Sequence, residues 1–322
     1  MQNVLLTFLV LYAPCNLFLY FEQKKRVMEE KLVSIITVTR NRGKLLGRCI
    51  DSVLGQTYKN IEHIVVDGAS DDETDDVINS YHDDRLKYVK LDTNWPVVKT
   101  MRFGISLAKG EYLAFLDSDD EYVPTKIEKQ VALIETLPEE YGMVYCWMTY
   151  FDSSKDNAII KTHKTELRGF VPIEAAEKPT VSGTPTFLFR KKAFERFGGW
   201  AENDPIGYDW ELGARYCQTG YVDYVPESLV NVYINHMYDR QSTQMRYDKS
   251  FLKKRIAMHK YQLEEFKETF DKRPSARWYN YMSLAFFSLK DHDVKNTFKY
   301  SWLFTVNATK KFVLEKLFKR KN

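Results

Sequence analysis

The residues best suited to chemistry are three aspartates that follow a short apolar stretch in the first half of the chain. Residues 111–116 read Glu-Tyr-Leu-Ala-Phe-Leu, and Asp117, Asp119 and Asp120 come after them. An apolar run without polar alternation is typical of a strand buried on both faces of a parallel sheet. Ligands of such sheets bind beyond the carboxyl ends of the strands. Carboxylates at that position suit a hard cation, Mn²⁺ or Mg²⁺, holding a phosphate-bearing substrate.

Two other interpretations of these acidic residues stay open. They can simply begin the next helix, which Pro124 and the apolar spacing after it predict, because negative charge complements the helix dipole there. Asp117, Asp119 and Glu128 also have the spacing of an EF-hand calcium loop. That loop needs glycine where Tyr122 stands, and a strand precedes it here instead of a helix.

The elements that must position the aspartates follow a repeating order. Four apolar runs predict strands, and apolar residues three and four positions apart predict helices after them. The runs are residues 33–39, 61–66, 86–91 and 111–116. This alternation predicts an α/β fold with a mostly parallel sheet and helices on both faces. No Gly-x-Gly-x-x-Gly motif follows the first run, which argues against a dinucleotide dehydrogenase.

A fourth acidic residue, Asp67, stands at the end of the second run. Ser70 and Glu73 have the spacing of a capping box, which predicts that a helix begins at Ser70. Asp67 precedes that cap, so helix capping does not account for it. Its place at a strand end makes it a candidate binding residue.

Composition indicates one large domain with a smaller appendage. The chain has 322 residues, 44% of them hydrophobic, which is enough for a sizeable core. Its cysteines show no paired spacing, so we expect reduced, buried thiols and neither disulfides nor a zinc site. They are Cys15, Cys49, Cys146 and Cys217.

The C-terminal part is basic. Residues 241–322 carry 19 Lys and Arg against 8 Asp and Glu, a net charge of +11, whereas the preceding residues carry −8. We expect helices from about residue 244, with aromatic faces that pack against the large domain. The lysine clusters would also suit an anionic membrane surface, whereas no nucleic-acid recognition module is visible. The aromatic faces contain Trp278, Tyr281, Ala285 and Leu289 on one helix, and Val294, Phe298, Trp302 and Leu303 on the next.

The N-terminal 27 residues permit three interpretations. Residues 4–21 are mostly apolar, and Lys24, Lys25 and Arg26 follow them. The segment can be a membrane anchor with its basic flank in the cytoplasm, an interfacial segment, or an extension before a true start at Met28. The expected organisation is therefore 1–27 as this segment, 28–243 as the main domain and 244–322 as a basic helical extension.

Four motifs in a fixed order carry a family resemblance. They are residues 34–42 (Ser-Ile-Ile-Thr-Val-Thr-Arg-Asn-Arg), 65–71 (Val-Val-Asp-Gly-Ala-Ser-Asp), 108–112 (Ala-Lys-Gly-Glu-Tyr) and 116–124, which contains Asp117-Ser118-Asp119-Asp120. The sequence resembles the inverting family 2 glycosyltransferases, with the GT-A fold of nucleotide-diphospho-sugar transferases. The resemblance extends over about residues 32–242.

The resemblance implies a set of donor-binding residues. Thr39 would lie beside the nucleotide base and Asp67 would accept a hydrogen bond from it, the base usually being uracil. Asn41 and Arg42 would complete the nucleotide site. Asp117 would approach the ribose or the metal, and Asp119 would bind the divalent cation, with His236 near the diphosphate as a further candidate ligand. A single histidine is more often structural.

The resemblance also implies a general base, Asp209, within residues 207–212 (Gly-Tyr-Asp-Trp-Glu-Leu). Inversion is a single displacement, so the attacking hydroxyl needs a carboxylate within hydrogen-bond reach to take its proton. The cation stabilises the leaving diphosphate on the opposite side of the sugar. The family more often has an acid where Tyr208 stands here. Asp209 could alternatively be only a carboxylate that complements a helix N-terminus.

One departure from the family keeps other functions open. Pro96, Lys99 and Arg102 occupy positions where a glycine, a small polar turn and an asparagine usually lie close to the donor. The alternatives are a sugar-nucleotide nucleotidyltransferase and a non-catalytic, membrane-associated scaffold with the same fold. No Gln-x-x-Arg-Trp motif follows Asp209, which argues against a processive polysaccharide synthase.

The sequence therefore predicts a metal-assisted, inverting glycosyltransferase for cell-surface glycan or polysaccharide assembly. The expected donor is a UDP-sugar, and the expected acceptor is a saccharide or a lipid-linked saccharide. We expect the protein in the cytoplasm, associated with the inner face of the cell membrane.

Overall fold

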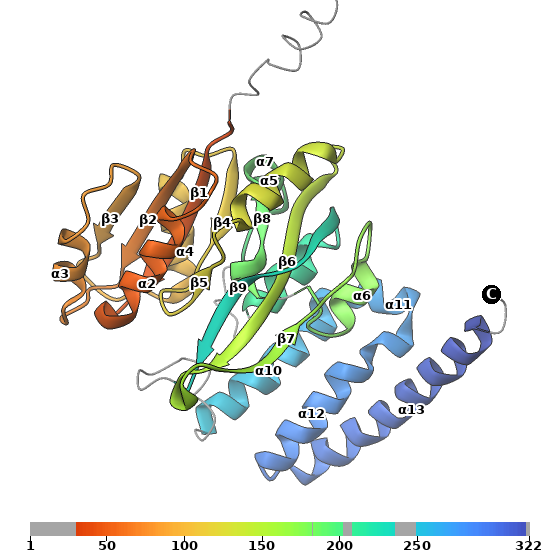
Figure 1. Cartoon of the computed structure of the whole chain (residues 1–322). Helices are drawn as coiled ribbons and strands as arrows, with labels where there is room; N and C mark the ends of the chain where they lie inside the picture. Colours follow the sequence, from red (N-terminus) through yellow and green to blue (C-terminus); the bar gives the residue numbers. More distant parts are fainter. Residues whose placement is uncertain (1–29, 182, 202–207, 236–248, 320–322) are drawn as a thin grey trace, which may run out of the picture.

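The computed structural model describes residues 30–181, 183–201, 208–235 and 249–319 (Figure 1). Four sequence predictions fall outside this part of the chain. They are the interpretation of residues 1–27, the roles of His236 and Cys15, and the boundary at residue 243. Among the helices of the described residues, none combines the length and the apolar composition needed to cross a bilayer.

Within the described residues, a nine-stranded sheet forms the centre, in the order β3-β2-β1-β4-β8-β6-β9-β5, with β7 paired to β6. The first four strands of this order are mutually parallel, as the alternation in the sequence predicts. The strands are β1 (Val33–Thr39), β2 (Ile61–Asp67), β3 (Leu86–Lys90), β4 (Tyr112–Phe115), β5 (Glu121–Tyr122), β6 (Tyr141–Asp152), β7 (Ala158–His163), β8 (Leu188–Arg190) and β9 (Tyr221–Ile234).

Helices cover both faces of this sheet, again as predicted. The helices of the main part are α2 (Gly43–Leu54), α3 (Thr74–Asn79), α4 (Val97–Leu107), α5 (Lys126–Thr136), α6 (Pro172–Glu177), α7 (Lys191–Phe197) and α8 (Tyr208–Tyr216). Neighbouring residues of β1 point to opposite faces, so Ile36 packs with α4 and Ile35 packs with α2. A strand buried on both faces needs an apolar residue at nearly every position, which explains the run in the sequence.

One glycine sets how closely a helix approaches the sheet. A Cβ atom at Gly104 of α4 would lie 2.7 Å from Cγ2 of Ile36. Any larger residue would therefore push α4 away from the centre of β1.

The capping-box prediction is wrong. Helix α3 begins at Thr74, and the hydroxyl of Ser70 instead donates to the carboxylate of Asp67 at 2.5 Å. Near the helix start it is the carboxylate of Asp72 that accepts a hydrogen bond from a backbone N–H, that of Thr74, at 3.1 Å. Ser70 is thus committed to the strand end and not to the helix.

The thiols agree with the prediction for the described residues. Cys49, Cys146 and Cys217 are buried and free. Burial raises the pKa of the Cys146 thiol to about 11, so it stays protonated at neutral pH.

The C-terminal part is helical, as expected. It consists of α10 (Lys249–Glu265), α11 (Lys267–Lys272), α12 (Trp278–Lys290) and α13 (Val294–Lys319). Helices α10 and α11 share a small core with α6 and α8. We call it the third core. Its members are Ala176, Trp210, Ala214, Met258, Phe266, Phe270 and Ala276.

The predicted role of the aromatic faces of α12 and α13 is wrong for several residues. Leu289, Val294, Phe298 and Trp302 are exposed and do not pack against the main domain. Part of the predicted face of α12 instead contacts α13, where the rings of Tyr281 and Tyr300 stack with centroids 6.3 Å apart. Periodicity identifies an apolar face, but it does not say what covers that face.

Candidate active site

The candidate site lies at the carboxyl edge of the parallel strands. Thr39 at the end of β1 is the register partner of Asp67 at the end of β2. On the other side of β1, Ile36 pairs with Phe115 of β4, so the loop that carries the three aspartates leaves the sheet at this same edge. Two separate sequence signals, Asp67 and the Asp117 loop, therefore meet at one end of one strand.

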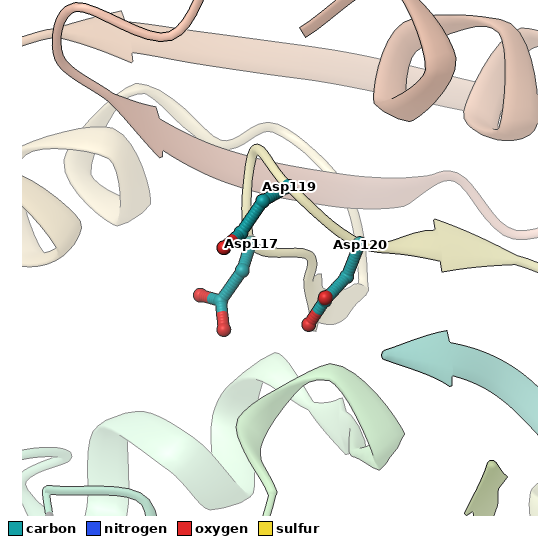
Figure 2. A group of neighbouring side chains, drawn as sticks. All are labelled: Asp117, Asp119 and Asp120. Atoms are coloured by element: carbon teal, nitrogen blue, oxygen red, sulfur yellow. The ribbon is translucent and has the colours of Figure 1, made fainter. Parts of the chain in front are cut away.

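The carboxylates of Asp117, Asp119 and Asp120 form a cluster. One oxygen from each lies within 4.8 Å of the others. Figure 2 shows the three carboxylates on the same side of the loop between β4 and β5. Asp119 and Asp120 are buried and Asp117 is half-buried. Such oxygen donors fit Mn²⁺ or Mg²⁺, which prefer carboxylates and water as ligands.

Two arginines of the β1–α2 region face this loop. Nη1 of Arg42 lies 3.2 Å from Oδ1 of Asp119. Arg48 donates to the backbone carbonyl of Asp119 at 2.5 Å, and its guanidinium lies 3.6 Å from the ring centroid of Tyr233. The sequence analysis identified Arg42 but missed Arg48 and Tyr233. Arg48 lies away from the buried face of α2, which contains Leu46, Cys49, Ile50 and Val53, so the periodicity of this helix gave no signal for it.

Asp120 has a structural function in this loop. Its carboxylate accepts a hydrogen bond from the backbone N–H of Tyr233 at 3.1 Å, and its own N–H donates to the carbonyl of Asp117 at 3.0 Å. The hydroxyl of Tyr233 donates to Glu121 at 2.7 Å. Asp120 therefore ties the aspartate loop to β9.

The EF-hand interpretation does not agree with the geometry. The carboxylate of Glu128, which would complete a calcium loop, accepts a hydrogen bond from the Thr57 hydroxyl at 2.6 Å. Glu128 is not in the carboxylate cluster. A strand, β4, precedes the loop.

The predicted nucleotide side is built around Asp67. Its carboxylate accepts from the backbone N–H of Ser70 at 3.1 Å and from the hydroxyl of Tyr88 at 2.8 Å. The Thr39 hydroxyl is buried, with no hydrogen-bond partner among the residues that the structure describes, and the same holds for the Ser118 hydroxyl. Buried hydroxyls are nearly always paired, so a ligand that supplies these partners fits here.

Asn41 joins the loops after β1 and β2. Its backbone has a left-handed conformation with φ of 50°, a region that asparagine tolerates better than most residues. Its side-chain oxygen accepts from the N–H of Asp71 at 3.0 Å, and its own N–H donates to the Ser70 hydroxyl at 2.8 Å. Thr39 and Asp67, which end β1 and β2, are thus followed by two connected loops, the first of which contains Asn41 and Arg42.

Asp209 lies in the first turn of α8 and is half-buried. The next residue, Trp210, belongs to the third core, and its indole N–H donates to the carbonyl of Ala175 at 2.9 Å. This anchor fixes the start of the helix. The role of Asp209 as a base stays a prediction.

Glu211, one position beyond that anchor, is a buried carboxylate. It pairs with Arg215 at 3.2 Å, and Arg215 also donates to the carbonyl of Gly199 at 2.8 Å. Burial raises the pKa of Glu211 to about 7, and the ion pair only partly opposes this.

This raised pKa leads to a first prediction. Below about pH 4.5 the Glu211 carboxyl is protonated in both the folded and the unfolded state. Between pH 4.5 and 7 the unfolded state loses this proton while the folded state keeps it, so the stability of the wild type falls as the pH rises. Glu211→Gln removes this term. We therefore expect the unfolding free energy of the variant, relative to that of the wild type, to rise by on the order of 2 kcal/mol between pH 5 and pH 8. Urea unfolding at several pH values measures this, and parallel pH curves would contradict it.

The residues that depart from the family pattern lie at or near the start of α4. Pro96 precedes the helix, Nζ of Lys99 is 4.1 Å from the ring centroid of Trp95, and Arg102 is exposed. A Cβ atom at Gly68 would lie 3.0 Å from the side chain of Asn94. The segment before α4 therefore borders the Asp67 loop.

Comparison with known proteins identifies the family. The model described as Glycosyl transferase family 2 matches residues 34–198, which is half of the chain and includes the Asp67 and Asp117 loops. The chain belongs to glycosyltransferase family 2. The resemblance found in the sequence is thereby confirmed.

Two curated relatives of this family 2 glycosyltransferase show how far the sequence similarity extends. An uncharacterized glycosyltransferase of Rickettsia typhi is 30% identical over 219 residues, which is 66% of each chain. The Escherichia coli UDP-Glc:alpha-D-GlcNAc-diphosphoundecaprenol beta-1,3-glucosyltransferase WfaP is 42% identical over 106 residues, 33% of this chain and 42% of WfaP. The chain thus spans about two thirds of the first relative and less than half of the second.

Solved structures agree on the fold. TarS of S. aureus in complex with UDP-GlcNAc has a TM-score of 0.56 at 15% identity and covers 79% of this chain and 80% of its own. The Pyrobaculum calidifontis mannosyltransferase PcManGT, in complex with GDP-Man and Mn²⁺, has a TM-score of 0.54 at 16% identity and covers 91% and 80%. The family 2 glycosyltransferase described here therefore has the predicted GT-A fold.

Proposed function

We propose that this protein transfers a sugar from a nucleotide-diphospho-sugar, with UDP as the nucleotide, to an acceptor hydroxyl with inversion. The proposal rests on one observation, the cluster of Asp117, Asp119 and Asp120 at the sheet edge where the Thr39 hydroxyl is buried without a hydrogen-bond partner in the described part of the chain. The donor named for WfaP and the ligand of TarS, both UDP-sugars, support the choice of nucleotide. The product would enter a cell-surface glycan or polysaccharide.

Each group of the chain has a defined task in this proposal. Asp67 and Thr39 bind the base and orient the donor. Asp117 and Asp119 would hold a divalent cation, which when bound neutralises charge on the diphosphate. Arg42, which pairs with Asp119, adds positive charge on the same side.

The reaction itself exchanges two bonds at the anomeric carbon. The acceptor oxygen forms its bond to that carbon as the bond to the diphosphate oxygen breaks, and the bonding electrons leave with the nucleotide diphosphate. Asp209 accepts the proton of the acceptor hydroxyl, so the nucleophile gains negative character only as it attacks. A displacement from the opposite side inverts the anomeric configuration.

The acceptor and the location are also part of the proposal. The acceptor class is a lipid-linked saccharide, which agrees with the diphosphoundecaprenol acceptor in the name of WfaP. An enzyme with such an acceptor works at the inner face of the cell membrane, where nucleotide-sugars are available.

A donor panel tests this function and forms a second prediction. Purified protein is incubated with a lipid-linked saccharide acceptor and UDP-, GDP- or dTDP-sugars in Mn²⁺, in Mg²⁺ and in EDTA, and the nucleotide and glycoside products are separated. We expect nucleoside diphosphate from UDP-sugars, only with metal, and a product whose anomeric configuration is the reverse of the donor's by NMR.

The two alternative functions predict other results. Consumption of pyrophosphate with formation of a sugar 1-phosphate would indicate a nucleotidyltransferase. Nucleotide binding without turnover would indicate a scaffold. Release of UDP with retained configuration would contradict the direct displacement.

A further inference from the structure

Helices α12 and α13 bury several polar residues, next to the buried Leu284 and Tyr300, and expose several large apolar ones. Asn280, Ser283 and Ser288 of α12 and Asn307 of α13 are at most 8% exposed. The large exposed side chains are Phe286 at 53%, Leu289 at 63%, Val294 at 65%, Phe298 at 74% and Trp302 at 67%. A helix pair with this distribution is stable in water only at the cost of a large wetted apolar surface.

This apolar surface is concentrated at one place. Of the twelve large hydrophobic side chains that are exposed in the described part of the chain, eight lie in α12 and α13. The spacing of Val294, Phe298 and Trp302 puts them on one side of α13. Figure 1 shows the two helices side by side at the end of the molecule opposite β3.

The turn between the helices places apolar residues of both at the same end of the hairpin. Asp293 accepts a hydrogen bond from the N–H of Asn296 at 3.0 Å and so caps the start of α13. Only three residues separate Lys290, which ends α12, from Val294, which starts α13. Leu289 and Val294 therefore lie at the same end of the hairpin, with Phe286 and Phe298 about one turn further along.

Exposed lysines accompany this surface. Lys290, Lys295, Lys299 and Lys310 are exposed, and Nζ of Lys290 lies 5.6 Å from the ring centroid of Phe286. The surface thus combines aromatic and aliphatic side chains with positive charge. Amphipathic helices that lie in the interface of a bilayer have this composition.

We propose that this hairpin docks onto an anionic lipid bilayer. The docking face consists of Phe286, Leu289, Val294, Phe298 and Trp302, with Lys290, Lys295 and Lys299 as its charged members. The apolar side chains would enter the headgroup region, and the lysines would contact anionic headgroups. The inference deepens the proposed membrane location, and it rests on the proposed function only for that location.

The charges favour a bilayer over a second copy of the chain. In a two-fold dimer the same face meets itself, so the lysines of one protomer would approach those of the other. Like charges facing each other cost affinity, and lysine is depleted from the centres of protein interfaces. The same lysines are attracted to the anionic headgroups of a bilayer.

Tryptophan fluorescence with brominated phospholipids tests the docking face in the full-length protein. Bromine on the acyl chains quenches a tryptophan that enters the bilayer. Residues 1–27 contain no tryptophan. Of the six tryptophans, Trp200 and Trp210 are buried, Trp95, Trp147 and Trp278 are half-buried and Trp302 is 67% exposed, so the quenching that is lost in Trp302→Phe reports on Trp302. We expect quenching with phosphatidylglycerol-containing vesicles, little with pure phosphatidylcholine, and loss of most quenching but not of sedimentation in Trp302→Phe.

Matched variants distinguish binding through this face from non-specific adsorption of the protein to vesicles. Phe298→Ser should raise the lipid concentration for half-maximal quenching by about tenfold or more. Ile159→Ser, which removes a 68% exposed side chain of β7, should leave it unchanged. The pair Lys295→Glu and Lys299→Glu should weaken binding by about tenfold or more at low salt.

Three results would overturn the proposal. The first is sedimentation with vesicles without quenching of Trp302, which would assign binding to residues 1–27 or to another surface. The second is no binding to anionic vesicles at all. The third is a dimer in light scattering that Phe298→Ser dissociates, which would make a second copy the occupant. Because none of these readouts uses turnover, the proposed chemistry can fail while this inference stands.

Discussion

Asp119→Ala will abolish turnover and the metal-dependent part of UDP binding. The expected loss in kcat is roughly 10³-fold or more, because the cation that offsets charge on the leaving diphosphate loses its main ligand. The fold should survive, since Arg42, the partner of Asp119, is partly exposed and can rehydrate. Titration calorimetry of UDP in Mn²⁺ and in EDTA measures the binding, and the donor panel measures turnover.

Glu128→Gln is the matched control for this variant. Glu128 has EF-hand spacing to the aspartates, but its carboxylate bonds to Thr57 and lies outside the cluster. Its replacement should leave metal-dependent UDP binding unchanged. If Asp119→Ala bound UDP with the wild-type metal dependence, the aspartate cluster would not be the cation site.

Asp209→Asn will reduce kcat by roughly 10²–10⁴-fold with little change in the affinity for the donor. Asparagine has nearly the same shape and remains a good residue for a helix start, but it cannot accept the proton of the acceptor hydroxyl. The Trp210 anchor is untouched, so the helix stays in place. Steady-state kinetics with varied acceptor, together with UDP calorimetry, separates the two quantities.

Asp76→Asn is the control for the alternative interpretation of Asp209. Asp76 is an exposed carboxylate in the first turn of α3, so it interacts with a helix dipole but lies on a different element. It should change neither kcat nor stability by much. Loss of donor binding in parallel with loss of turnover in Asp209→Asn would indicate that Asp209 has a structural role.

The sequence predicted those parts of the site that lie at strand ends. The run before Asp117 and the run before Asp67 are readable because a parallel strand is apolar at almost every position and stops at a polar residue. Parallel pairing then forces these ends to one edge, and the register of Thr39 with Asp67 agrees. Here local pattern and topology carry the same information.

Contacts between distant elements were not predictable in this way. Arg48 on α2 meets Tyr233 on β9, and Asp120 accepts from the backbone of the same tyrosine. In the sequence, Asp119 and Asp120 look equivalent, and only the pairing of β5 with β9 separates a candidate ligand from a residue that fixes the loop. Such differences depend on long-range packing, which leaves no local periodicity.

The exposed residues of α12 and α13 show a second limit. The spacing of Phe298 and Trp302 correctly indicates one side of a helix. The same spacing occurs on buried and on solvent-exposed helix faces, so it does not show whether that side is buried. What distinguishes them is the opposite side, where Asn280, Ser283 and Asn307 are buried. A polar side facing inward is the clearer signal, and it was present in the sequence.

The third core has a consequence for how such enzymes can be recombined. Trp210, next to Asp209, packs in one core with Met258 and Phe266 of the C-terminal region. An exchange of that region between relatives at residue 243 would leave a foreign surface against Trp210 and move the start of α8. A chimera that keeps its parental contacts must instead carry α6, α8 and the C-terminal helices from the same parent. In this protein the region around Asp209 and the C-terminal helices would therefore have to be exchanged together.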